Sequence, residues 1–240
     1  MVHPALPQIT MDDYIYCWSL VNTRTFYYTP PSKAKSKKVV DPNENMALNP
    51  FADYFNHSSH GCVVEFSKDG FEITTTQSIQ KGEEVYISYG KHGNDFLLAE
   101  YGFVMDDNEW DVVSLDDLVL EAMNEQQREL VKENRFEGRY VIDKQGPCYR
   151  TQVALRAIVM PERRWLRYIA GSDDGEAEQE EVDELLKGLL GKLKEQALKK
   201  ILEVATVERQ GKTVDKQPCE MLNKRWSQIC NMTKEWTGDT

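Results

Sequence analysis

The segment from Asn49 to Val104 constrains the fold of this chain most strongly, because it carries the clearest strand signals. Two β-prone runs, Cys62–Phe66 and Phe71–Thr75, flank an Asp-Gly dipeptide at positions 69–70. Asp-Gly between two such runs is the strongest short sequence signal for a β-hairpin. A third β-prone run, Val85–Tyr89, follows a Lys-Gly turn. Because no amphipathic helix separates these strands, we expect an antiparallel, mostly-β core in this segment.

A helix is predicted ahead of this core. Thr10 and Asp13 have the spacing of a capping box, and apolar residues then recur at helical intervals as far as Val21. We expect a helix from Met11 to Arg24 whose large aromatic side chains pack on the central segment. Taken alone, Arg24 is interpreted as a cation that suits the C-terminus of a helix.

A loop is predicted over residues 30–45, where two prolines are followed by the lysine-rich sequence KAKSKK. Nothing in this stretch could be buried in an apolar core. We interpret it as a solvated surface loop. A nuclear localisation patch, or a contact for an acidic partner, is the alternative.

From residue 94 onward the pattern is helical. A short helix over 94–101 is ended by Gly102, and further helices are expected over 114–133, 150–160, 185–202 and 218–236, with a turn at 143–146. The sequence therefore predicts an α+β protein, with a β core over residues 11–105 and an all-α module over residues 112–240. The apolar face of the helical part is continuous, so we expect this module to fold as a separable unit.

Composition limits the classes of function. The net charge is −11, so the chain should repel nucleic acid and attract basic partners. Its five cysteines form no CxxC pair, which predicts free thiols in a reducing compartment, either nucleus or cytoplasm. No apolar run reaches the roughly 18 residues of a membrane span, and the N-terminus has no secretory signal pattern. We expect an intracellular protein that binds neither membrane nor nucleic acid directly.

Two other functions could be assigned to the histidines and the cysteine of the central segment: a metal site and a cysteine nucleophile. His57, His60 and Cys62 form the pattern H-x-x-H-x-C, whose ligand types suit zinc, but a fourth ligand at a fixed spacing is missing. A Cys62–His57 nucleophile has no third group to orient it. Neither reading is favoured, and no metal is expected.

Four ordered segments point to a family. The segment 53–58 (DYFNHS), followed by 82–90 (GEEVYISYG), resembles the C-terminal half of a SET domain. The segments 94–103 (NDFLLAEYGF) and 21–26 (VNTRTF) look like the branch typified by Rubisco large-subunit methyltransferase. The resemblance implies that the β core is partly SET-like, with the Asn-His and Gly-Glu-Glu segments crossing as a pseudoknot beside S-adenosylmethionine. It also implies a helical substrate-binding module in the C-terminal part.

The same resemblance assigns roles to six residues. It implies that Asn56, His57 and Arg24 contact the cofactor, that Asp53 and Tyr101 lie on the lysine-channel side, and that Tyr89 is the catalytic tyrosine. Methyl transfer from a sulfonium to a neutral amine depends on alignment of the reacting atoms. A tyrosine with a pKa of ~10 is a poor base at neutral pH. We therefore assign the tyrosine hydroxyl to orientation and electrostatics.

Tyr54 and Tyr86 lie in the same two segments. For both we prefer a structural interpretation, as core tyrosines with satisfied hydroxyl groups.

Two functions follow from the resemblance. The first is an S-adenosylmethionine-dependent protein-lysine N-methyltransferase, or a portion of one, acting on a lysine of a non-histone protein. The second is a catalytically inactive SET-derived module that binds a protein partner. The feature that discriminates between them is the family's Gly-x-Gly cofactor cradle, which does not occur before Asn56. For this reason we expect the chain alone to bind S-adenosylmethionine weakly or not at all.

Overall fold

The computed structural model describes residues 9–28, 45–67, 70–210 and 216–237. The chain divides into two units, residues 1–92 and residues 93–240. Residues 30–44 of the predicted lysine-rich loop and Asp69 of the Asp-Gly dipeptide lie outside the described residues. The expected domains, 11–105 and 112–240, stay a prediction.

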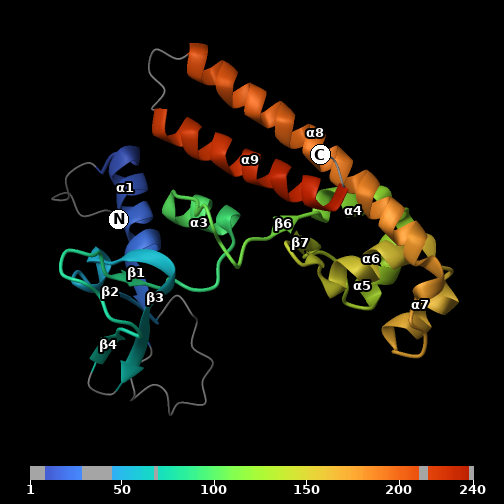
Figure 1. The fold of residues 1–240 in the computed structure, drawn as a ribbon, viewed down its shortest axis with the longest axis horizontal. Helices are drawn as coiled ribbons and strands as arrows, with labels where there is room; N and C mark the ends of the chain where they lie inside the picture. Colours follow the sequence, from blue (N-terminus) through green and yellow to red (C-terminus); the bar gives the residue numbers. More distant parts are fainter. Residues whose placement is uncertain (1–8, 29–44, 68–69, 211–215, 238–240) are drawn as a thin grey trace, which may run out of the picture. The chain divides into compact units, whose positions relative to one another are not determined.

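The first unit consists of one longer helix and short strands (Figure 1). Its elements are α1 (Met11–Arg24), β1 (Thr25–Tyr27), β2 (Met46–Leu48), the 3₁₀ helix η2 (Ala52–Tyr54), β3 (Asn56–Ser67), β4 (Gly70–Thr74) and β5 (Tyr86–Ile87). β1 pairs with β2, and β4, β3 and β5 form a second sheet in that order. An edge-on contact between Phe26 and Phe71, with ring centroids 5.0 Å apart, links the two sheets.

Helix α1 has the predicted bounds, because its start is encoded locally. The Thr10 side chain accepts a hydrogen bond from the Asp13 N–H, and the Asp13 carboxylate accepts one from the Thr10 N–H. The expected packing of this helix is wrong: none of its residues is buried, and Tyr14 and Trp18 are 60% and 57% exposed. Tyr14 and Trp18 stand four positions apart and share one face of the helix, whereas Tyr16 lies on another face.

The predicted hairpin is confirmed, since β3 and β4 pair antiparallel from Val63 with Thr74 to Ser67 with Gly70. The third strand differs from the expectation. β5 pairs parallel to β3, with Asn56 opposite Tyr86 and His57 opposite Ile87. Residues 75–85 form no strand and carry the chain back past the start of β3, so β5 can run in the same direction as β3.

Gly61 allows β3 and β5 to approach closely. Both His57 and Cys62 pair with Ile87, because the register shifts between them. A Cβ atom placed on Gly61 would lie 2.5 Å from the Ile87 carbonyl carbon and 2.7 Å from its Cα. Only glycine fits this crossing without a backbone shift.

The second unit is mainly helical. Its elements are α3 (Asn94–Tyr101), β6 (Val113–Ser114), α4 (Asp116–Ala122), α5 (Glu125–Glu133), β7 (Val141–Asp143), β8 (Gly146–Pro147), α6 (Tyr149–Val159), α7 (Glu162–Ile169), the 3₁₀ helix η3 (Glu176–Glu178), α8 (Gln179–Gln210) and α9 (Lys216–Thr237). Figure 1 shows α8 in orange and α9 in red running side by side. The fold class is α+β as predicted, but the C-terminal part is not all-α, because β6, β7 and β8 form a small sheet.

The helix expected over 114–133 is interrupted. α4 ends at Ala122, and Asn124 caps the start of α5. The Asn124 side chain accepts a hydrogen bond from the Gln127 N–H, and the Gln127 side chain accepts one from the Asn124 N–H. The pattern Asn-x-x-Gln is itself a capping box. The sequence therefore encodes the break between α4 and α5, but the apolar residues on both sides of it suggest one continuous helix.

A contiguous apolar core holds the second unit together. Trp165, Tyr140, Leu155, Leu189 and Leu190 are among its fully buried side chains. The indole of Trp165 donates to the Val153 carbonyl at 2.9 Å, which satisfies its buried N–H. Within the described residues, none of the helices has both the length and the apolar character needed to cross a membrane.

Candidate functional site

The parallel pairing of β3 and β5 brings His57 and Tyr89 together in the first unit. Nδ1 of His57 accepts a hydrogen bond from the backbone N–H of Tyr89 at 3.0 Å, and the two ring centroids lie 5.1 Å apart. The Tyr89 hydroxyl donates to the Phe55 carbonyl at 2.8 Å. Tyr89 is thus fixed at its backbone and at its hydroxyl by residues 55–57.

The His57 imidazole is neutral around pH 7. Burial is the largest influence and lowers its pKa from the ordinary 6.5, His92 lowers the pKa further, and a hydrogen bond with the Ile87 backbone acts in the opposite direction. Because Nδ1 accepts the Tyr89 N–H, the ring proton resides on Nε2. The His57 side chain therefore links the start of β3 to the segment that follows β5 by a hydrogen bond.

Asn56 forms a second link across the same crossing. Its Nδ2 donates to Glu84 Oε1 at 2.6 Å, and the Tyr86 hydroxyl donates to Glu84 Oε2 at 2.9 Å. This hydrogen bond and the negative charge of Glu84 raise the pKa of Tyr86. Glu84 was not singled out from the sequence, although the Gly-Glu-Glu turn was the available signal.

Tyr54 and Tyr86 are not core residues, contrary to expectation. Tyr54 is 84% exposed, and Tyr86 is 37% exposed. The reason for Tyr54 is its place at the end of the short helix η2, where no element covers it. Tyr86 finds its hydrogen-bond partner in Glu84 at the surface.

Arg24 and Asp53 form an ion pair. Arg24 Nη1 lies 3.0 Å from Asp53 Oδ1 and also donates to the Asp53 carbonyl at 3.2 Å. The pair ties the C-terminus of α1 to η2 and is partly exposed. It joins one residue expected on the cofactor side to one expected on the lysine side.

Tyr101 belongs to the second unit, so its position is described only within that unit. It is the last residue of α3, and Gly102 ends the helix in the left-handed conformation with φ of +78°. Burial raises the pKa of the Tyr101 hydroxyl, and Glu100 adds to the shift. The roles of all six predicted site residues stay predictions.

A cavity of about 350 Å³ lies beside the crossing, which is within the usual range for a small-molecule site. Its lining combines β3, β5 and the segment between β4 and β5: Ser58, His60, Gly61, Cys62, Thr75, Thr76, Gln77, Ser78, Ile79, Glu83, Glu84 and Tyr86. Two of these residues are carboxylates, which suits a ligand that carries positive charge. Glu84 connects the cavity to Asn56.

The zinc alternative finds no support in the described part of the chain. No group of three or more His, Cys, Asp or Glu side chains is arranged there to hold a metal ion. All five cysteines are free, and Cys62 is buried.

Comparison with known proteins identifies the class. The SET domain family matches residues 6–90. A second family, described as the Ribosomal lysine N-methyltransferase 2 C-terminal domain, matches residues 111–236. The chain is therefore a SET-domain protein. It belongs, more particularly, to the family that carries this C-terminal domain, and the resemblance seen in the sequence is confirmed.

Several curated proteins are similar to the chain. Ribosomal lysine N-methyltransferase set11 of Schizosaccharomyces pombe is 30% identical over 73% of this chain and 47% of that protein. Ribosomal lysine N-methyltransferase 2 of Saccharomyces cerevisiae is 29% identical over 74% of this chain and 40% of that protein. SET domain-containing protein 4 of mouse is 33% identical over 66% of this chain and 38% of that protein. The chain thus spans less than half the length of these relatives.

The fold also matches a solved structure. Rubisco LSMT bound to AdoMet superposes with a TM-score of 0.50, covering 97% of this chain and 57% of that chain, at 15% sequence identity. At this identity the match establishes a shared fold.

Proposed function

We propose that this chain forms part of an S-adenosylmethionine-dependent protein-lysine N-methyltransferase. The observation that carries the proposal is the crossing in which the His57 ring accepts the Tyr89 N–H while the Tyr89 hydroxyl donates to Phe55. An oriented tyrosine beside an Asn-His segment is what methyl transfer to a lysine amine requires. The names of the relatives, which are lysine methyltransferases, agree with this reaction.

The residues at the crossing fit S-adenosylmethionine, which supplies a methyl group on a positively charged sulfonium. The Asn56 side chain, the carboxylate of Glu84 and the hydroxyl of Tyr86 are linked by hydrogen bonds and reach the surface. An amide oxygen and a carboxylate suit a cationic ligand that also carries hydroxyl groups. Asn56 and Glu84 would hold the cofactor, and His57 would fix the backbone beneath it.

Tyr89 would orient the substrate amine. Because its proton is donated to the Phe55 carbonyl, the hydroxyl oxygen can accept a hydrogen bond from the N–H of a neutral lysine amine. The tyrosine stays uncharged, since its ordinary pKa is ~10. Its contribution is then alignment of nitrogen and methyl group rather than proton removal.

The expected substrate is a lysine on a non-histone protein. The net charge of −11 favours a basic protein partner. Two relatives are named as ribosomal lysine methyltransferases, which supports a ribosomal protein as the substrate. Asp53 and Tyr101 are the residues we assign to the lysine side.

A labelling experiment tests this function. The full-length natural protein is incubated with S-adenosylmethionine carrying a radioactive methyl group and with purified ribosomal proteins, and labelled peptides are identified by mass spectrometry. We expect label on a lysine side chain, with a mass increase of one or more methyl groups. Stable binding to a ribosomal protein without any label would instead favour the inactive binding module.

A further inference from the structure

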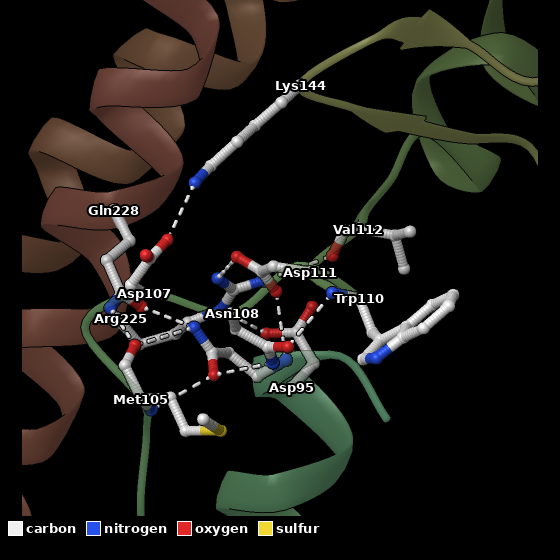
Figure 2. A network of polar contacts seen from close by, with 11 residues as sticks. Asp95, Met105, Asp107, Asn108, Trp110, Asp111, Val112, Lys144, Arg225 and Gln228 are labelled. Carbon is white, nitrogen blue, oxygen red and sulfur yellow. Dashed lines mark hydrogen bonds and ion pairs between the residues drawn. The ribbon is translucent and has the colours of Figure 1, made fainter. Parts of the chain in front are cut away.

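A buried arginine of α9 holds the first turn of α3 (Figure 2). The Arg225 side chain is almost completely buried, and Nε lies 2.7 Å from Asp95 Oδ1 while Nη1 lies 2.7 Å from Asp111 Oδ2. Its Nη2 donates to the Val112 carbonyl at 3.2 Å. One guanidinium of α9 thus connects to two sites, Asp95 and Asp111, that lie 130 and 114 positions earlier in the sequence.

Asn94 completes this connection from the side of α3. Its N–H donates to Asp111 Oδ1 at 2.9 Å, so one carboxylate binds both Asn94 and Arg225. The buried Asn94 side chain donates to the Met105 carbonyl and accepts the Met105 N–H, each at 3.1 Å. The Asn94 side chain therefore links the start of α3 to Met105, which follows the end of the helix.

A second residue of α9 reaches the same place. Gln228, one helical turn after Arg225, donates to the Met105 carbonyl at 2.7 Å, and its Oε1 accepts from Asn94 Nδ2 at 3.1 Å. Figure 2 shows Gln228, Arg225 and Met105 meeting between α9 and the segment after α3. The α3 segment is thus anchored to α9 mainly by buried polar groups.

These hydrogen bonds and ion pairs act on a helix that is too short to be stable in isolation. α3 has only 8 residues, and isolated helices shorter than about 12 residues are marginal in water. Asp95 is in its first turn and Tyr101 is its last residue, so we expect a change at the anchored end to affect the position of the tyrosine.

We propose that Arg225 is a positioning residue that fixes α3, and with it Tyr101, by means of Asp95 and Asp111. This inference rests on the proposed function in so far as Tyr101 serves the lysine substrate. The anchoring of α3 itself requires only the hydrogen bonds described above.

Asp95→Asn is the most informative variant. The Asp95 side chain is 57% exposed, so loss of its charge leaves no buried unpaired group, and the buried pair of Arg225 with Asp111 stays intact. Arg225→Lys, which keeps the charge but lacks the planar guanidinium fork that reaches all three acceptors, is the second variant. Glu220→Gln is the matched control, because Glu220 is an exposed residue of α9 and its substitution also removes one negative charge.

Amide hydrogen exchange measured by mass spectrometry tests the anchoring. In Asp95→Asn we expect the α3 amides to exchange about tenfold faster, the order expected for loss of a charge-assisted hydrogen bond. The amides of α8 should be unchanged, and Glu220→Gln should match the wild type throughout. Unchanged α3 exchange in both Asp95→Asn and Arg225→Lys would overturn the proposal, as would equal acceleration in α3 and α8.

Kinetics of the full-length protein test the link to Tyr101. We expect Asp95→Asn to raise the KM for the protein substrate several-fold and to leave the KM for S-adenosylmethionine unchanged. In a Tyr101→Phe background the same substitution should add nothing further, whereas additive effects would overturn the link. The exchange result does not depend on methylation, so failure of the proposed function and failure of this inference are distinguishable.

Discussion

His57 joins two segments through a hydrogen bond that requires an unprotonated Nδ1. Protonation of Nδ1 would remove the acceptor for the Tyr89 N–H. Burial lowers the pKa of His57 below 6.5, so between pH 6.5 and that lower value the unfolded chain binds a proton that the folded chain does not. By linkage, the free energy of unfolding falls as the pH falls through this window.

This pH dependence can be measured by urea denaturation between pH 5 and pH 7. We expect the wild type to lose stability towards pH 5, and His57→Gln to be less stable at pH 7 but to show a flatter dependence. His60→Gln is the control, because it leaves the His57–Tyr89 hydrogen bond intact. Parallel pH profiles for wild type and His57→Gln would contradict the role assigned to the ring.

At the residue scale, local motifs were readable from the sequence and distant partners were not. Asn56, His57 and Tyr89 were found because they stand in short segments typical of a family. Arg225 carries no local signal, since Asp95 and Asp111 are 130 and 114 positions away. Its importance depends on burial and on the meeting of three segments, which only the fold determines.

At the scale of elements, the crossing of β3 and β5 depends on Gly61. In Gly61→Ala the new methyl group would meet the Ile87 backbone, and we expect a loss of about 1–3 kcal/mol, as for overpacking in a core. Gly188→Ala in α8 meets no atom within 4 Å and should stabilise its helix by up to about 1 kcal/mol. Thermal unfolding of both variants checks this pair, and a Gly61→Ala protein as stable as the wild type would argue against the close approach.

Elements with local determinants were predicted best. The bounds of α1 follow from its capping box, and the β3–β4 hairpin follows from Asp-Gly. The parallel direction of β5 was missed because periodicity gives no strand direction. The β6–β7–β8 sheet was missed because two of its strands have only two residues each.

At the scale of the whole molecule, the arginine network bears on where the helical unit begins. A fragment of residues 112–240 would lack both Asp95 and Asp111, so Arg225 would lose both of its ion pairs together with the segment that carries them. Removal of the partners of a buried charge costs about 3–5 kcal/mol. We therefore expect a fragment of residues 93–240 to unfold cooperatively at a clearly higher Tm than a fragment of residues 112–240.

Arg225→Met provides the control for this comparison. The substitution should lower the Tm of the 93–240 fragment, where it removes both ion pairs, and should change the Tm of the 112–240 fragment little, because the carboxylate partners of Arg225 are already absent there. Equal Tm values for the two wild-type fragments, measured by circular dichroism, would show that the network does not support the unit.

The central claim is that the β3–β5 crossing orients Tyr89 for methyl transfer, and the rate of transfer by Tyr89→Phe tests it most directly. The substitution removes one hydroxyl that donates to Phe55 and almost no volume, so the Tm should change little. Loss of a preorganised group lowers turnover by about 100-fold or more. Tyr54→Phe is the control, because Tyr54 is a tyrosine of the same unit whose side chain is 84% exposed. We predict a rate about 100-fold below wild type for Tyr89→Phe alone; equal rates for Tyr89→Phe and wild type would contradict the account.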